Sequence, residues 1–524
     1  MKTLLGALSG LLAAALGIAA AELVAALLPG VTSPLLAVGN RFVDWTPPPL
    51  KDFAIETFGS ADKAVLLGGM VVTVAVLAAL AGALGVHRPR VAAGAFVVLV
   101  VVAGAATVAD RAASAGIAVR LVPVAVMLLA GLAALLGLLH LLGSRVVRPT
   151  TRDGASSGTR PEGTPPEGRD FDRRRFLAAA AAVSAAAAGG GLASRAIGGA
   201  AASDRAALEL PAASDGAGPI PRGTVLDVDG ITPYVTPNAD FYRVDTALQV
   251  PKVPLDTWSL RIHGMVDSDI ELTFEDLLAM PLVERRVTMT CVSNPVGGEL
   301  VGTATWLGVR TKDLLAMAGV QAGADAVKST SADDMTIGTP LEALTDDREA
   351  LIVVGMNGEP LPLDHGFPVR MITPGLYGYV GATKWLVDLE VTRFADFEAY
   401  WTPRGYAEEA PIKLSARIDV PRSFARVRRG PVTVAGVAWA QPTGVARVEV
   451  RVDHGDWEVA ELGTADTPHT WRQWRHTWDA GEPGGHTLVV RCTDTDGNVQ
   501  VEERAPVAPD GSSGWHSVRV TVED

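Results

Sequence analysis

The first 143 residues consist mainly of long apolar runs. Four runs contain no Asp, Glu, Lys or Arg: Leu4–Ala21, Ala64–Val86, Val91–Ala109 and Leu121–Gly143. A helix needs roughly 18–20 apolar residues to cross about 30 Å of hydrocarbon, and each run is close to or above that length. The pattern therefore predicts a bundle of four transmembrane helices in residues 1–143. A signal peptide is the alternative for the first run, although no clear cleavage site precedes Glu22.

A polar stretch and a fifth, weaker apolar run follow. Residues 149–170 are mainly Pro, Gly, Ser, Thr and Arg and have no apolar face, so we expect a disordered cytoplasmic linker over 144–172. The residues DRRRFL at 172–177 then lead into an Ala-rich run that ends near Ala202. Two arginines, a variable residue, Phe-Leu and a mildly apolar run resemble a twin-arginine export signal, with a stop-transfer helix as the alternative. We expect segment 173–202 to be this signal and a fifth transmembrane helix.

The distribution of charge predicts the orientation of these helices. The link HRPR at 87–90 is basic and arginines are frequent from Arg145 onward, whereas the loop Pro29–Lys63 has three basic and four acidic residues. By the positive-inside rule, the N-terminus, the 87–90 link and residues 144–175 are cytoplasmic. A fifth span then places residues 205–524 on the extracytoplasmic side of the cytoplasmic membrane.

Short strand and helix patterns are mixed in residues 205–411, which predicts an α+β domain. Ser259–Gly264 has the pattern of a strand. The residues TFED at 273–276 have the spacing of a capping box at the start of a short helix. The residues TPLE at 339–342 predict a second cap, with Pro at the first helical position.

Residues 412–524 have the pattern of an all-β domain. Val448, Val450 and Val452 alternate with charged residues, and about seven short strands are separated by turn signals. This spacing predicts an immunoglobulin-like sandwich. Four tryptophans of the region are expected in its core or at an interface: Trp457, Trp471, Trp474 and Trp478.

Composition excludes several functional classes. Lys+Arg 45 against Asp+Glu 58 gives the 524 residues a net charge of −13, which argues against nucleic-acid binding. Two cysteines exclude a disulfide scaffold and a zinc site built on paired CxxC motifs. Only His140 lies inside one of the four apolar runs, and membrane haems usually need facing histidine pairs, so we predict that the chain holds no haem.

Candidate chemistry begins at Cys291, where the strand-like run VTMTC enters a Gly-rich loop. We expect an exposed thiol at the end of a rigid strand, where a thiolate can bind a soft metal and the loop leaves room for a bulky cofactor. A buried structural cysteine is the alternative. Downstream, His365, Arg370 and Lys384 surround Gly-rich turns and predict a cradle for a phosphate group.

From about Thr236 to Val522 the sequence resembles the sulfite oxidase family of molybdopterin-dependent oxidoreductases. The motifs that carry the resemblance are specific in combination and weak alone. They are ADFYRVDTA (239–247), LRIHG (260–264), FEDLLAMP (274–281), TCVSNPVGG (290–298), ATWLGV (304–309), DHGFPVRMITPGLYGYVGATKWL (364–386) and YWTPRGY (400–406). The resemblance implies a molybdopterin-binding domain over 205–411. It also implies that 412–524 is the domain that this family uses for dimerisation, so a homodimer is expected.

The resemblance implies roles for individual residues. Cys291 matches the thiolate ligand of molybdenum, and Tyr406 matches a tyrosine near the oxo face where substrate arrives. The other matching residues contact the cofactor: Phe241 and Arg243 lie in the loop against the pterin, and His365, Arg370 and Lys384 grip its ring system and phosphate. Trp306 forms a wall of the pocket or belongs to the core.

Two departures from the family pattern bear on the substrate. The ligand cysteine is followed by Val292-Ser293-Asn294-Pro295 instead of Ala-Gly-Asn-Arg, and Arg243-Val244-Asp245 replaces Arg-Asn-His. Less positive charge near a dianion site weakens the case for sulfite.

The sequence therefore predicts a membrane-anchored, extracytoplasmic molybdenum oxidoreductase. It would transfer an oxygen atom and two electrons on a small, sulfur-containing substrate and exchange electrons with a separate carrier or a membrane redox partner. A sulfoxide reductase, acting on a group such as oxidised methionine, is the alternative among enzymes. A non-catalytic cell-surface binding protein with an immunoglobulin-like module is the alternative from another class.

Overall fold

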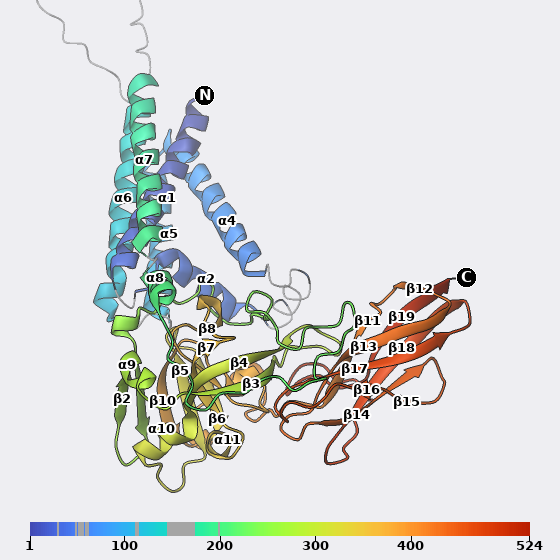
Figure 1. Cartoon of the computed structure of the whole chain (residues 1–524). Coiled ribbons are helices and arrows are strands. Elements are labelled where there is room, and N and C mark those ends of the chain that lie inside the picture. The colour runs from blue at the N-terminus through green and yellow to red at the C-terminus, as the bar shows by residue number, and fades with distance from the viewer. Residues whose placement is uncertain are drawn as a thin grey trace, which may run out of the picture. The chain divides into compact units, whose positions relative to one another are not determined.

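The computed structural model describes residues 1–28, 31–47, 50, 57, 62–110, 115–143, 173–197 and 200–523. The linker predicted at 144–172 lies outside the described residues. The chain contains two compact units, Met1–Gly199 and Ala200–Asp524. The first unit is helical, and the second contains the β-strands (Figure 1).

Five long apolar helices form most of the first unit. Their bounds are Lys2–Leu27 (α1), Asp62–Gly85 (α4), Pro89–Ala109 (α5), Ile117–Gly143 (α6) and Arg173–Ile197 (α7). Each contains a segment that is long and apolar enough to cross a membrane, as the hydrophobic pattern predicted. A shorter helix, Pro34–Trp45 (α2), begins after Ser33, whose Oγ accepts a hydrogen bond from Leu36 N at 3.4 Å.

Glycines allow α1 and α4 to approach closely. A Cβ added at Gly10 in α1 would lie 1.9 Å from Ala78 O, and a Cβ added at Gly82 in α4 would lie 2.2 Å from Gly6 O. Because backbone carbonyls occupy these positions, larger side chains would force the two helices apart. Small residues at such contacts are typical of helices that pack inside a membrane.

Two β-sheets form the first part of the second unit. Their strands are Ser259–Gly264 (β1), Ile270–Thr273 (β2), Val283–Thr290 (β3), Val301–Arg310 (β4), Ala326–Ser331 (β5), Thr336–Pro340 (β6), Leu351–Met356 (β7), Glu359–Pro360 (β8), Arg370–Ile372 (β9) and Leu386–Thr392 (β10). One sheet has the order β2-β1-β10-β5-β6, in which β1 and β10 are parallel. The other has the order β3-β4-β7-β8, with β9 paired to β7. The strand predicted at 259–264 is confirmed as β1.

Short helices precede, connect or follow these strands. They are Ala200–Ala207 (α8), Leu255–Thr257 (η2), Phe274–Leu278 (α9), Thr311–Ala318 (α10), Leu341–Thr345 (α11), Leu363–His365 (η3), Gly378–Gly381 (α12), Phe394–Asp396 (η4) and Thr402–Arg404 (η5). The capping box at 273–276 is confirmed, because Thr273 and Asp276 exchange hydrogen bonds. The second predicted cap is wrong, because Thr339 lies in β6 and its hydroxyl donates to Val380 O.

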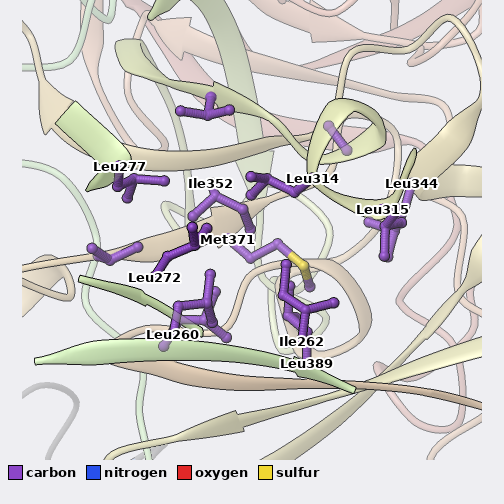
Figure 2. Packing of buried hydrophobic residues seen from close by; sticks show 14 of the residues in the cluster. Leu260, Ile262, Leu272, Leu277, Leu314, Leu315, Leu344, Ile352, Met371 and Leu389 are labelled. Carbon is purple, nitrogen blue, oxygen red and sulfur yellow. The ribbon is translucent and has the colours of Figure 1, made fainter. Parts of the chain in front are cut away.

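The core of this α+β domain lies between the two sheets. Figure 2 shows Ile262 and Leu389 from the first sheet next to Met371 from the second. Leu277 in α9 and Leu314 in α10 are fully buried in the same cluster. Burying one such side chain contributes roughly 1.5–3 kcal/mol, so this cluster anchors the strands that carry the candidate site.

Residues 415–523, called the C-terminal sandwich below, form two further sheets. Their strands are Ser415–Val420 (β11), Arg426–Arg428 (β12), Gly430–Trp439 (β13), Val445–Val452 (β14), Glu458–Val459 (β15), Glu461–Leu462 (β16), Arg472–Ala480 (β17), Gly484–Asp494 (β18) and His516–Glu523 (β19). They pair in the orders β11-β13-β17-β16 and β12-β19-β18-β14-β15. The sandwich has more strands than the roughly seven that the sequence predicted, because β12, β15 and β16 are too short to show alternation. Val448 and Val450 are buried in the sandwich core, so the β-rich C-terminal region is confirmed.

The four tryptophans of the sandwich lie in different environments. Trp474 is fully buried in the sandwich core, and Trp457 and Trp478 are half-buried. Trp471 is fully buried where the sandwich meets the α+β domain, and its backbone N donates to Thr288 Oγ1 in β3 at 2.8 Å. The sandwich therefore packs directly on the strand that leads to Cys291.

Candidate active site

The loop between β3 and β4 carries Cys291 and is held by its own hydrogen bonds. Cys291 N donates to Leu300 O at 2.9 Å, and Cys291 O accepts from Asn294 N at 3.0 Å. Asn294 Oδ1 accepts from Leu300 N at 2.9 Å. The predicted change from strand to Gly-rich loop is confirmed, since β3 ends at Thr290 and Gly297 has a φ of 80°.

The Cys291 thiol is buried, with 8% of the residue exposed, which corrects the expectation of an exposed thiol at the strand end. The loop turns inward because Val292 packs in one cluster with Trp471 of the sandwich. Burial raises the pKa of Cys291, while hydrogen bonds from Ser293 and the positive charge of Lys384 act in the opposite direction. Coordination to a metal deprotonates a thiol outright, so this environment suits a metal-bound cysteine better than a free nucleophile.

His365 and Arg370 form the most buried part of the predicted cradle. His365 Nε2 lies 3.2 Å from Asn238 O, and Arg370 Nη1 donates to His365 O at 3.1 Å. The Arg370 Cζ lies 5.3 Å from the centre of the Trp306 ring. Burial lowers the pKa of Arg370 to about 10, and burial with the nearby Arg370 charge lowers the pKa of His365 to about 4. At neutral pH a neutral histidine therefore lies beside a buried positive charge.

The Arg370 guanidinium has an unsatisfied donor. Arg370 is 4% exposed, and its Nε has no hydrogen-bond partner among the described residues. A buried charged group without enough partners costs several kcal/mol. An anionic ligand next to Arg370 would remove that cost, so this donor makes the place a candidate ligand site.

Lys384 and Arg243, in contrast, are paired with carboxylates. Lys384 Nζ lies 2.7 Å from Asp245 Oδ2 and donates to Asp364 O at 3.2 Å. Arg243 Nε lies 2.9 Å from the same Asp245 oxygen, and Arg243 Nη1 lies 3.4 Å from Asp364 Oδ2. The cradle is therefore less positive than its basic residues suggest. Asp245 was visible in the sequence as a departure from the family pattern, but nothing local revealed its partner Lys384, 139 residues away.

Aromatic rings enclose the cradle. Phe241 is 5% exposed, and its ring centre lies 5.7 Å from Trp306 and 5.6 Å from His365, edge-on to both. Trp306 is fully buried, which favours a core role for it. Tyr242 stacks on Phe241 at 5.2 Å, and burial and a thiolate at Cys291 both raise the pKa of Tyr242. Sequence reasoning missed Tyr242, although it is the neighbour of Phe241.

Tyr406 lies in a separate aromatic group. Its ring centre is 5.3 Å from Trp401 and 5.4 Å from Tyr379. Trp401 and Tyr379 also line a narrow hollow together with Phe397. Tyr406 is half-buried, and its two ring partners Trp401 and Tyr379 form part of the wall of this hollow.

Tyr377, which sequence reasoning also missed, is buried in a cluster against which Tyr379 and Tyr406 pack. It is 4% exposed and lies two residues before Tyr379 in the motif PGLYGY. Burial raises the pKa of Tyr377 to about 12, and a thiolate at Cys291 acts in the same direction. The closely spaced pair in Tyr377-Gly378-Tyr379 was a local signal that could have marked this tyrosine.

Comparison with known proteins identifies the class of the second unit. Residues 247–401 match the family model described as oxidoreductase molybdopterin binding domain. The mitochondrial sulfite oxidase of Homo sapiens is 31% identical over 344 residues, covering 55% of this chain and 62% of that protein. The uncharacterized oxidoreductase YuiH of Bacillus subtilis (strain 168) is 32% identical over 176 residues, covering 33% of this chain and 85% of that protein.

Two further similarities are more distant. The NAD(P)H nitrate reductase of Hordeum vulgare is 28% identical over 332 residues, covering 51% of this chain and 37% of that protein. The crystal structure of the sulfane dehydrogenase SoxCD from Paracoccus pantotrophus aligns with a TM-score of 0.48 and 21% identity, covering 56% of this chain and 85% of that chain.

The second unit thus contains a molybdopterin-binding oxidoreductase domain. The chain belongs to the sulfite oxidase family of molybdopterin-dependent oxidoreductases. This domain belongs to a family of oxidoreductases, which argues against the non-catalytic binding protein. The chain spans 62% of the length of the human sulfite oxidase that it matches.

The residues present fit the cofactor of this family. Cys291 offers a soft sulfur ligand in a place that disfavours a free thiolate. Arg370 offers a buried, unsatisfied donor that suits an anionic group such as the phosphate of molybdopterin.

Proposed function

We propose that this chain is a membrane-anchored molybdenum oxidoreductase that acts outside the cytoplasmic membrane. It transfers an oxygen atom and two electrons on a small, sulfur-containing substrate. The observation that carries the proposal is a buried soft ligand together with a buried, unsatisfied cation: Cys291 is 8% exposed, and Arg370 is 4% exposed with no partner for its Nε among the described residues. A metal and an anionic cofactor need these two kinds of group.

The side chains of the site would hold the cofactor in different ways. Cys291 would bind the metal through sulfur and release its proton. Arg370 and Lys384 would donate hydrogen bonds to anionic groups, and the neutral His365 would form one more. When bound, the cofactor supplies the two-electron redox chemistry of molybdenum. The edge-on ring of Phe241 would keep water away from this region.

Tyr406 and the hollow beside it form the proposed substrate approach. The walls of the hollow include Tyr379, Phe397 and Trp401, and aromatic walls favour an uncharged group. The Tyr406 hydroxyl would donate a hydrogen bond to a substrate oxygen and hold it in place.

The charge of the site supports an uncharged sulfur substrate rather than a dianion. Asp245 pairs with Lys384 and Arg243 and so reduces the attraction that these groups offer to sulfite. The same observation favours a second candidate, a sulfoxide reductase, because sulfoxides are uncharged and need only the opposite direction of oxygen transfer.

The membrane part of the proposal rests on the helices and on charge. The five apolar helices would lie in the cytoplasmic membrane. The basic link 87–90 and the arginines at 173–175 support cytoplasmic positions at those helix ends, and the twin-arginine-like signal supports export of 205–524. A separate electron carrier or a membrane redox partner would exchange electrons with the site, and we predict no haem in the chain.

We also infer that 412–524 is an immunoglobulin-like domain that supports a homodimer, next to a cofactor domain at 205–411. Two facing sheets of four and five strands support this assignment. Light scattering of the full chain in detergent should give twice the chain mass after subtraction of detergent. A monomer at every concentration would contradict the dimer.

Metal analysis tests the proposed function. The full chain, purified in detergent from cells with intact molybdopterin synthesis, should contain stoichiometric molybdenum, and the same chain from cells without that synthesis should contain none. Assays with sulfite, thioethers and sulfoxides, using dye acceptors and donors, then distinguish oxidation from reduction. A chain that lacks molybdenum in cofactor-competent cells would contradict the proposal.

A further inference from the structure

The C-terminal sandwich contacts the loop that carries Cys291. Arg417, in β11, donates from Nη1 to Gly298 O at 2.7 Å. The same guanidinium donates to Asp419 Oδ1 at 2.7 Å and to Thr232 Oγ1 at 2.8 Å, and its side chain is 7% exposed. Because three partners hold the guanidinium plane, its hydrogen bond to the loop has a fixed position and direction.

Ser512 holds the middle of the same loop. Ser512 Oγ donates to Asn294 O at 2.7 Å. Asn294 is the residue that closes the loop on itself, through its contacts with Cys291 O and Leu300 N. A shift of Asn294 would therefore move the backbone of Cys291.

His516, the first residue of β19, completes the contact at Gly297. An added Cβ at Gly297 would lie 2.2 Å from His516 Cδ2, so the imidazole occupies the space that any larger residue would need. His516 Nδ1 accepts from Ile418 N at 3.0 Å, which fixes the orientation of the ring. The loop thus meets a rigid surface rather than a mobile side chain.

The sandwich also holds the strand before Cys291. Thr288 N donates to His469 O at 2.9 Å, and Gln441 Nε2 donates to Thr288 O at 2.6 Å. Together with the hydrogen bond from Trp471 N to Thr288 Oγ1, these contacts lie three residues before the cysteine. Groups of the sandwich therefore hold the chain on both sides of Cys291.

We propose that Arg417, Ser512 and His516 are positioning residues that fix the direction of the Cys291 sulfur, so that the sandwich forms part of the redox site. The ligand role of Cys291 rests on the proposed function, whereas the hold on its loop does not. A metal ligand on a loop keeps its direction only when groups outside the loop support it. Simple packing between domains would instead leave Cys291 unaffected when one contact is lost.

Thiol reactivity in the cofactor-free full chain tests the hold on the loop. The chain is produced in cells without molybdopterin synthesis, and alkylation by iodoacetamide is followed by mass spectrometry at both cysteines. Cys492 is fully buried in β18 and reports whether the sandwich itself stays folded. Ser512→Ala should raise the alkylation rate of Cys291 roughly fivefold, the effect of one lost hydrogen bond on a local opening equilibrium. The rate at Cys492 should not change.

Two further variants and one control sharpen this test. Arg417→Lys should raise the alkylation rate of Cys291 at least as much as Ser512→Ala does, because a lysine cannot serve three acceptors in one plane. Ser512→Thr keeps the hydroxyl, so Cys291 should be alkylated as slowly in this variant as in the wild type. Arg426→Ala is the matched control, because Arg426 is an exposed arginine of the same sandwich that pairs with Glu523. An unchanged Cys291 rate in Ser512→Ala and Arg417→Lys would overturn the proposal. A parallel rise at Cys492 in both variants would also overturn it.

The cofactor-loaded chain separates this inference from the proposed function. Ser512→Ala should retain its molybdenum but shift the electron paramagnetic resonance g values of Mo(V), whereas Arg426→Ala should keep the wild-type spectrum. A wild-type chain without molybdenum would contradict the proposed function and leave the alkylation result intact. Wild-type spectra together with wild-type alkylation rates in Ser512→Ala would overturn the positioning role alone.

Discussion

Lys384 Nζ lies 2.7 Å from Asp245 Oδ2, and the Asp245 side chain is 2% exposed. Arg243 Nε lies 2.9 Å from the same oxygen. Two basic residues that the family resemblance assigns to the cofactor therefore share one buried carboxylate. Because opposite charges at such distances largely cancel, the site offers less positive charge to an incoming anion. The charge of Asp245 should thus influence which substrates bind.

Asp245→Asn should increase the affinity of the cofactor-loaded full chain for sulfate roughly tenfold, because the charges of Lys384 and Arg243 lose their shared carboxylate. Isothermal titration calorimetry with sulfate measures this change. Asp240→Asn is the control, since Asp240 is exposed in the same segment. Equal sulfate affinity in Asp245→Asn and wild type would contradict the argument for an uncharged substrate.

Cys291→Ser should keep the fold and most of the molybdenum but lower turnover by several orders of magnitude. A hydroxyl is a harder and weaker electron donor than a thiolate, while the cradle around Arg370 still holds the rest of the cofactor. Turnover and metal content of the purified chain check this. Cys492→Ser is the control, because Cys492 is also free and buried, with its Sγ 3.5 Å from Gln500 Oε1. Near wild-type turnover in molybdenum-loaded Cys291→Ser would exclude the ligand role.

Replacing Arg173 and Arg174 together by Lys should keep residues 205–524 in the cytoplasm. Both arginines are exposed at the start of α7, where an export receptor can read their guanidinium groups. A reporter fused after Asp524 shows on which side that end lies. Replacing Arg88 and Arg90 by Lys is the control, because these arginines lie in a basic link outside the twin-arginine-like motif and the change keeps their positive charge. Export of residues 205–524 should stay intact in this variant. Normal export of the Arg173 and Arg174 variant would favour the stop-transfer helix.

Glu349 should contribute to stability in a pH-dependent way. The hydrogen bond from Arg285 is the largest cause that lowers the pKa of Glu349 from 4.5 to about 2, and a second from Arg310 Nε at 2.8 Å adds to it. Since the folded state holds this carboxylate at a lower pKa than the unfolded state, the contribution is complete above pH 4.5 and is lost as the pH falls toward 2.

Glu349→Gln should therefore lower the free energy of unfolding at pH 7 by roughly 1–2 kcal/mol, a value reduced because the carboxylate is partly exposed and screened by solvent. The difference from wild type should shrink below pH 4.5. Denaturant unfolding of the full chain, followed by tryptophan fluorescence, measures both effects. Glu408→Gln, at an exposed carboxylate, is the control. A difference that stays constant from pH 7 to pH 3 would contradict this account.

Several features of the protein could be inferred from residues close together in the chain. The apolar runs predicted the five long helices, and the spacing of Thr273 and Asp276 predicted the cap of α9. The alternation in Ser259–Gly264 predicted β1 with its bounds. These signals are local because helix hydrogen bonds, caps and strand alternation all relate residues within about four positions. The family motifs around Cys291 likewise indicated the class of enzyme.

Other features depended on contacts between distant residues. The Thr339 hydroxyl bonds Val380 O, 41 residues away, instead of capping α11. Cys291 is buried rather than exposed, because the sandwich packs over its loop. Ser512 reaches Asn294 across 218 residues. No spacing in the sequence encodes such pairs, since they form only when burial of apolar surface brings the α+β domain and the sandwich together.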